Sequence, residues 1–219
     1  MKNRIFTSIL LACCILPATL SYAVEPKNLD LVKDKLIQYH DSGVYEKDQA
    51  KVIHLALEYL KTRLQRPDKK PLAIVLDIDE TSLSNYPDMV KMSFGGSKEE
   101  IDNAENKGTD PTIQPTLELY RFAKDQHIAV FFVTGRTENA RSATERNLGE
   151  AGFSNWNGLV LKPTDYHEKS NIPYKSNARK QIESQGYEIV LNIGDQQSDL
   201  SGGHADKTFK MPNPFYKLP

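Results

Sequence analysis

A short apolar run followed at once by two acids constrains this chain more than any other segment. Residues 72–76 read LAIVL, with no alternation of polar and apolar residues, which predicts a strand buried on both faces, as in a parallel sheet. Asp77 and Asp79 follow at the point where that strand would leave the core. Burying a carboxylate is costly unless it is paired or coordinates a metal, so these two acids indicate a site for a hard cation.

The rest of the chain alternates short apolar runs with segments of helical periodicity. Four further runs are expected to be strands: residues 128–133, 159–161, 189–193 and 208–211. Three segments between them are expected to be helices: residues 116–125, 138–151 and 176–185. Strands that alternate with helices imply βαβ units joined by right-handed crossovers, and therefore an α/β fold around a parallel sheet.

Two segments lie outside this alternation. Residues 24–66 show amphipathic helical spacing interrupted at 41–43, which predicts two N-terminal helices. Residues 85–112 contain three glycines and few apolar residues, which predicts a small insertion that forms a lid or partial cap over the mouth of the sheet. Tyr86 and Phe94 within it either stack on a substrate ring or pack the insertion onto the core.

Residues 1–23 have the order typical of a secretory signal peptide. Two positive residues precede an apolar stretch over 5–20, and small residues at the peptidase positions predict cleavage after Ala23. This interpretation places the mature protein, residues 24–219, in a periplasm or outside the cell. The alternatives are a buried N-terminal helix and a lipoprotein signal with a lipid anchor at Cys13.

Composition argues against several classes of function. The two cysteines, Cys13 and Cys14, both lie in the leader, so a mature chain would have neither a disulfide nor a cysteine-ligated zinc site. The formal net charge is −1 and no block of Lys or Arg is present, which argues against binding to a nucleic acid polymer or a membrane surface. No transmembrane segment is expected in the mature chain.

Charged and polar side chains are expected to gather at one edge of the sheet, because ligands of open parallel sheets bind beyond the carboxyl ends of the strands. The residues that follow the predicted strands are Asp77, Asp79, Thr134, Gly135, Arg136, Lys175, Asp195 and Asp199. Taken alone, each has an ordinary structural explanation, such as a helix cap or a solvated lysine. Their shared position after buried strands favours a single site.

Four short motifs in this order resemble those of the haloacid dehalogenase (HAD) superfamily of phosphatases. They are DIDET at 77–81, TGR at 134–136, KS at 175–176 and GDQQSD at 194–199. With the closing PNP at 212–214, they look like the secreted acid phosphatases of the plant vegetative storage type and their bacterial class B/C relatives, subfamily IIIB. The resemblance implies a three-layer, HAD-like Rossmannoid fold with a central parallel sheet, N-terminal helices and a small cap-like insertion.

The chain departs from the bacterial lipoprotein-type acid phosphatases at three positions. Gln196 and Gln197 stand where that type usually has Asn and Leu, and Asp88 stands where it usually has Tyr. The aromatic contacts of that type are therefore not reproduced position by position. A nucleotide remains one candidate substrate among small phosphorylated metabolites.

The resemblance implies a role for each residue that would touch the phosphate. Asp77 would attack phosphorus and form an aspartyl-phosphate, and Asp79 would act first as general acid and then as general base. Thr134 and the backbone N–H of Gly135 would bind phosphoryl oxygens, and Lys175 would neutralise negative charge.

The resemblance also implies a Mg²⁺ ion held by oxygen ligands. Asp77 and Asp195 would bind it through their carboxylates and Asp79 through its backbone carbonyl, while Asp199 would complete the shell directly or through water. Arg136 would either contact the substrate phosphate or pair with a carboxylate.

Together these expectations describe a Mg²⁺-dependent phosphomonoesterase, an acid phosphatase for small phosphorylated metabolites. Two rivals stay open: a non-catalytic storage or binding protein on the same scaffold, and a phosphotransferase that would share every residue. Retention of the carboxylates and of Lys175 favours an enzyme over the first rival. The sequence leaves the formation of a homo-oligomer open.

Overall fold

The computed structural model describes residues 25–67 and 69–218. The predicted signal peptide, its cleavage after Ala23 and the alternative anchor at Cys13 lie outside these residues. Within the part of the chain that is described, no helix is both long and apolar enough to cross a membrane.

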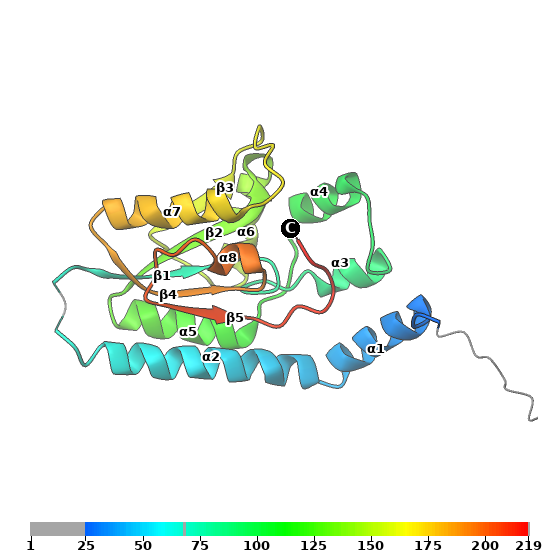
Figure 1. Cartoon of the computed structure of the whole chain (residues 1–219), viewed down its shortest axis with the longest axis horizontal. Coiled ribbons are helices and arrows are strands. Elements are labelled where there is room, and N and C mark those ends of the chain that lie inside the picture. Colours follow the sequence, from blue (N-terminus) through cyan, green and yellow to red (C-terminus); the bar gives the residue numbers. More distant parts are fainter. Residues whose placement is uncertain (1–24, 68, 219) are drawn as a thin grey trace, which may run out of the picture.

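Among the described residues, five parallel strands form one central sheet (Figure 1). In chain order they are β1 (Leu72–Leu76), β2 (Ala129–Thr137), β3 (Gly158–Lys162), β4 (Glu188–Gly194) and β5 (Lys207–Lys210). Their order across the sheet is β3-β2-β1-β4-β5, and every pairing is parallel. The predicted α/β fold and all five predicted strands are confirmed, with β1 in the middle.

Helices cover both faces of the sheet (Figure 1). Alternate residues of β1 point to opposite faces, because side chains along a strand have a period of two. One face packs against α2 (Val44–Arg63) and α5 (Gln114–Asp125), and the other against α7 (Ile172–Ser184). All residues of β1 are buried, so the carboxylates that follow it start from the interior.

The remaining helices largely follow the prediction. Helix α1 (Leu29–Asp41) and α2 are the two predicted N-terminal helices. The segment predicted as one helix over 138–151 is divided into a 3-10 turn, η1 (Glu138–Ala140), and α6 (Arg141–Glu150). Gly152 follows α6 with a φ of +95°, the left-handed conformation that ends a helix.

The insertion at 85–112 contains two helices that the sequence pattern did not predict. Helices α3 (Tyr86–Lys91) and α4 (Lys98–Lys107) lie beyond the carboxyl ends of the strands (Figure 1). Helix α4 has no buried residue and begins with a capping box between Ser97 and Glu100. Because α4 depends on capping more than on core packing, apolar periodicity gave no signal for it.

The two aromatic residues of the insertion have different environments. Tyr86 is 7% exposed and packs in a cluster with Tyr45 and Phe215. The ring of His40 stacks on Tyr86 with 3.4 Å between centroids. Phe94 is only partly buried and lines the cavity at the end of the sheet. Packing onto the core is confirmed for Tyr86 and also for Phe94, which packs against the same cluster and stacks on Phe215. Stacking of Phe94 on a substrate stays a prediction.

Glu80 ties the loop after β1 to helix α2. The Tyr45 hydroxyl donates a hydrogen bond to the Glu80 carboxylate, and Ser84 Oγ donates a second one, 3.0 Å long. Glu80 is fully buried with a φ of +52°, and burial raises its pKa to about 7. The two donors oppose this rise because they favour the ionised carboxylate.

Tyr45→Phe is expected to lower the free energy of unfolding by about 1.5–3 kcal/mol at pH 8, the range for a hydrogen bond to a charged group. The pKa of Glu80 in the folded protein lies above its unfolded value of 4.5, so the folded state holds the extra proton, and stability falls as pH rises from 4.5 to about 7. The loss in Tyr45→Phe should therefore be smaller at pH 5, where Glu80 is protonated.

Urea denaturation at pH 5 and pH 8 measures both effects. Tyr59→Phe, a partly buried tyrosine of the same helix, is the matched control and should change stability little at either pH. An equal loss for Tyr45→Phe at the two pH values would contradict a charge-assisted bond to Glu80.

Candidate active site

Asp77 follows β1, at the point where the strand order of the sheet reverses. The connection after β1 leads to β2 on one side of it, and the connection after β3 leads to β4 on the other side, so a crevice opens at the carboxyl end of β1. The Asp77 backbone N–H donates to the Ile193 carbonyl at 2.9 Å, and Ser82 Oγ donates to the Asp77 carbonyl at 2.7 Å. Ile78 is fully buried and anchors the loop in the core.

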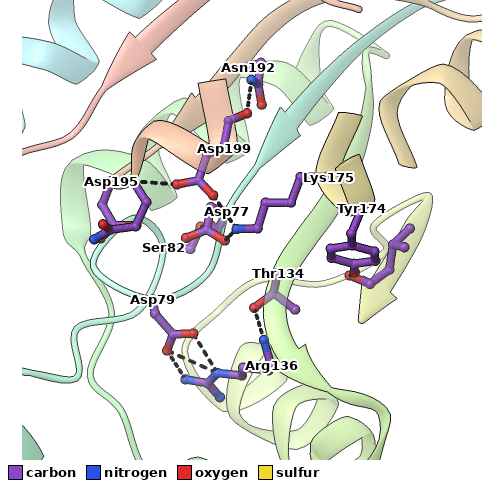
Figure 2. Close-up of polar contacts among 12 residues, drawn as sticks. Asp77, Asp79, Ser82, Thr134, Arg136, Tyr174, Lys175, Asn192, Asp195 and Asp199 are labelled. Atoms are coloured by element: carbon purple, nitrogen blue, oxygen red, sulfur yellow. Dashed lines mark hydrogen bonds and ion pairs between the residues drawn. The ribbon is translucent and has the colours of Figure 1, made fainter. Parts of the chain in front are cut away.

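Lys175, on helix α7, joins two of the predicted acids (Figure 2). Its Nζ donates to Asp77 Oδ1 at 2.7 Å and also to Asp199 Oδ1. All three side chains are nearly fully buried, so water screens their charges weakly. Burial raises the pKa of Asp77 well above its usual value, and Asp199 adds to the rise while Lys175 opposes it. One lysine thus faces more than one negative charge.

Asp195 completes a group of three carboxylates with the spacing of a metal site. Oxygens of Asp77, Asp195 and Asp199 lie within 4.8 Å of one another. Asp195 Oδ2 accepts hydrogen bonds from the side-chain amides of Gln196 and Asn213, both at 2.6 Å. Because both amides use the same oxygen, Oδ1 of Asp195 is the atom left for a cation.

Asp199, the third residue of α8 (Gln197–Leu200), is less suited to direct ligation. Its Oδ1 accepts from Lys175, and its Oδ2 accepts from the Gln196 backbone N–H at 2.7 Å. Because both Asp199 oxygens already accept hydrogen bonds, the predicted contact with Mg²⁺ through water fits Asp199 better than direct ligation does.

The balance of charge around these acids fits a divalent cation. Burial raises the pKa of Asp195 to about 6, and the neighbouring charge of Asp199 adds to the rise. A cation between Asp195 and Asp77 would offset this repulsion. Carboxylate oxygens are the ligands that Mg²⁺ prefers, so the residues present fit that ion.

The side chain of Asp79 points away from Lys175 and toward Arg136 (Figure 2). Arg136 donates to Asp79 Oδ1 from Nε at 3.1 Å and from Nη2 at 2.7 Å. The same Nη2 donates to Asp110 Oδ2 at 2.7 Å. Of the two alternatives for Arg136, the carboxylate pair is therefore present, and contact with a substrate phosphate stays a prediction.

Thr134 and Gly135 lie in β2, beside the end of β1. Thr134 is fully buried, and its Oγ1 accepts a hydrogen bond from the Arg136 backbone N–H at 3.1 Å. Gly135 lines the cavity at the end of the sheet, where a Cβ on it would lie 3.4 Å from Asn171 Nδ2. Binding of phosphoryl oxygens by these two residues stays a prediction.

A cavity of about 470 Å³ lies beyond the carboxyl ends of β1 and β4. It exposes Asp77, Asp79, Lys175 and Asp195 to a ligand. Its walls come from the insertion, the end of β3, the segment before α7 and the C-terminal segment: Phe94, Lys98, Ile101, Glu105, Lys162, Lys169 and Tyr216. The volume is typical of a small-molecule site, and residues of the insertion line it.

Sequence reasoning missed several residues that support the site. Asp110 pairs with Arg136, while Gln196 and Asn213 fix one oxygen of Asp195. Only the PNP segment at 212–214 gave any hint of Asn213. No spacing or periodicity signalled Asp110, which lies at the end of the insertion.

Comparison with known protein families settles the family of the chain. Residues 2–219 match the family described as HAD superfamily, subfamily IIIB (Acid phosphatase). The chain belongs to this family. The match confirms the resemblance seen in the four motifs, and it extends over the N-terminal helices and the insertion.

Relatives of this subfamily IIIB protein include both enzymes and storage proteins. It is 35% identical over 211 residues to Acid phosphatase 1 of Solanum lycopersicum, a match that covers 91% of this chain and 82% of that protein. It is 32% identical over 194 residues to Vegetative storage protein 2 of Arabidopsis thaliana, covering 87% of this chain and 71% of that protein. Membership in the acid phosphatase family confirms the prediction of a phosphatase, a hydrolase of phosphoric monoesters.

The fold of the subfamily IIIB chain is similar to that of a solved bacterial structure. The class C acid phosphatase from Bacillus anthracis superimposes with a TM-score of 0.72 at 22% identity. The superposition covers 85% of this chain and 84% of that one. It confirms the predicted HAD-like α/β fold around a central parallel sheet.

Proposed function

We propose that this protein hydrolyses small phosphomonoesters with the help of Mg²⁺ and through an aspartyl-phosphate on Asp77. The fixed position of the Asp77 carboxylate carries the proposal. Lys175 holds one of its oxygens at 2.7 Å, Asp195 lies close enough to share a cation, and the carboxylate lines the cavity. One lysine cannot neutralise the buried Asp77, Asp195 and Asp199 together, so this cluster would be costly to keep without a cation.

In the proposed first step, an Asp77 oxygen attacks phosphorus and the bond from phosphorus to the leaving oxygen breaks. Lys175 and the Gly135 N–H stabilise the charge on the phosphoryl oxygens. Burial alone would lower the pKa of Lys175, but Asp199 and Asp77 raise it above its usual value, so the amine stays protonated. Mg²⁺, held by Asp77 and Asp195, would reduce the repulsion between the anionic nucleophile and the anionic phosphate.

Asp79 serves as the proton donor and acceptor of the proposed mechanism. Its side chain is 19% exposed and lines the cavity, so it can reach the leaving oxygen. Asp79 gives that oxygen a proton in the first step. In the second step it removes a proton from water, which then attacks phosphorus and releases phosphate from Asp77.

The direct test is phosphate release by residues 24–219 from p-nitrophenyl phosphate and a panel of nucleotides and other small phosphomonoesters. We expect release with Mg²⁺ and little release after chelation. Rapid quenching followed by mass spectrometry should find the phosphoryl group on the peptide that contains Asp77. Activity that is indifferent to chelation, or a phosphoryl group on another residue, would overturn this mechanism.

Mg²⁺ should also stabilise the folded protein in the absence of substrate. A ligand at 100 times its Kd that binds the native state alone stabilises it by about 2.7 kcal/mol, which raises Tm by roughly 5–10 °C for a protein of this size. Thermal unfolding of the chelated protein with and without added Mg²⁺ measures the shift. Asp195→Asn should remove the shift, while Asp165→Asn, on an exposed loop, should keep it. A full shift in Asp195→Asn would contradict the ligand assignment.

We propose a periplasmic or extracellular location, with residues 1–23 removed as a signal peptide and residues 24–219 forming the phosphatase domain. The insertion at 85–112 would act as a partial cap. N-terminal sequencing of the exported protein tests the cleavage after Ala23.

A second candidate function is storage, because one relative carries the name of a vegetative storage protein. No phosphate release from any substrate in the panel would favour that candidate.

A further inference from the structure

Arg136 lies between two carboxylates that come from different parts of the chain. Its side chain is 0% exposed, and its Nη2 is 2.7 Å from both Asp79 Oδ1 and Asp110 Oδ2. Its Nε lies 3.1 Å and 3.2 Å from the two oxygens of Asp79. Its Nη1 is buried without a partner among the described residues, so the side-chain hydrogen bonds that Arg136 makes there all go to these two acids.

Asp110 is itself fixed by its backbone. The Asp110 N–H donates to Asn147 Oδ1 at 3.0 Å, and Asn147 Nδ2 donates to the Asp110 carbonyl at 2.9 Å. Asn147 lies on α6 and is buried. The next residue, Pro111, accepts a hydrogen bond from the Ser84 N–H at 2.8 Å, close to the loop that carries Asp79. The Asp110 carboxylate is therefore a rigid partner for Arg136.

The backbone of Arg136 is held as well, through its N–H bond to Thr134 Oγ1 at 3.1 Å. Thr134 holds the backbone of Arg136 and Asp110 holds its Nη2. The side chain is therefore fixed in an orientation in which Nε and Nη2 both face Asp79. A planar fork with two donors fixes a carboxylate in angle as well as in distance. Asp79 is thus oriented by a chain of contacts that begins at Asn147, outside the cavity.

We propose that Asp110 is a positioning residue for Asp79, acting through Arg136. Its contact with Arg136 would raise kcat/KM for substrates with poor leaving groups. The inference rests on the proposed function, in which Asp79 protonates the leaving oxygen. Asp110 does not line the cavity and touches no reacting atom. Its effect on the reaction would pass entirely through the orientation of the Asp79 carboxylate.

The leaving group separates this role from a merely structural one. An alkoxide leaves only when it receives a proton, whereas p-nitrophenolate is a stable anion that departs without one. Loss of orientation at the general acid should therefore slow an alkyl phosphate much more than p-nitrophenyl phosphate. Loss of fold, of Mg²⁺ or of the nucleophile would slow both substrates alike.

The experiment measures kcat/KM of the Mg²⁺-loaded protein for glycerol phosphate and for p-nitrophenyl phosphate. Asp110→Asn is expected to lose about 10- to 100-fold with glycerol phosphate and less than about threefold with p-nitrophenyl phosphate. Arg136→Lys, which keeps the charge and loses the fork, should give the same selective loss. Asp48→Asn is the matched control, since Asp48 is a partly buried acid of α2 that pairs with Lys51 instead, and it should change neither substrate.

Asp79→Asn supplies the reference pattern. If Asp79→Asn is selective for glycerol phosphate and Asp110→Asn slows both substrates equally, the positioning role is overturned while the proposed function stands. If Asp79→Asn itself slows both equally, the general-acid role falls, and the inference falls with it. A selective loss in both Asp79→Asn and Asp110→Asn supports the positioning role.

Discussion

Asp77→Asn is expected to lower kcat for phosphate release by about 10⁴-fold or more, the scale on which loss of a catalytic nucleophile acts. The amide that replaces the carboxylate is a poor nucleophile and a weak ligand for Mg²⁺. The loss should be similar for alkyl and aryl phosphates, because both need the Asp77 nucleophile in the step in which the leaving group departs. Steady-state phosphate release with both substrates measures it.

The control for Asp77→Asn is its stability in chelator. Asparagine has nearly the same shape and removes one of the negative charges around Lys175, which keeps its contact with Asp199. We therefore expect the variant to resist urea at least as well as the parent when both lack metal. A folded Asp77→Asn protein that retained activity would rule out attack by Asp77.

Lys175→Met is expected to damage both stability and activity. Lys175 is nearly fully buried and bonds to Asp77 and Asp199, so its removal leaves two uncompensated charges in the interior. Breaking a buried ion pair in this way costs about 3–5 kcal/mol. Loss of a charged donor to the transition state should also lower kcat by about 10²–10³-fold. Urea denaturation and phosphate release measure the two effects.

Added Mg²⁺ should recover part of the stability of Lys175→Met, because the cation offsets the same negative charge. It should not restore kcat, since the phosphoryl oxygens still lack the amine. Lys162→Met is the matched control: Lys162 also lines the cavity but is half-buried, and it should change the free energy of unfolding little. Equal losses of stability in the two variants would contradict the ion-pair argument.

The sequence predicted the sheet and the acids at its edge for a physical reason. Strands buried on both faces are continuous apolar runs, and parallel strands bring their carboxyl ends to one edge. Asp77, Thr134 and Asp195 could therefore be placed together from their positions at the carboxyl ends of the predicted strands. The pairing of Lys175 with Asp77 followed only from the family resemblance, since Lys175 lies within a helix.

Other parts of the site carry no periodic signal. Arg136 was assigned two alternatives because a sequence does not show which acids surround a side chain, and Asp110 reaches it from the end of an irregular insertion. The contact between Tyr45 and Glu80 joins residues 35 positions apart that belong to different kinds of element. Such contacts depend on tertiary packing, which local patterns do not encode.

The contact between Lys175 and Asp77 spans 98 positions of the chain and has a consequence for the kinetics of folding. In the unfolded chain the acids of the cluster lie apart and in water. They come together only after β1 has paired with both β2 and β4. Long-range pairing of this kind is slow to form. A cation that binds only the assembled cluster leaves the rate of folding unchanged and slows unfolding, so it lengthens the lifetime of the native state.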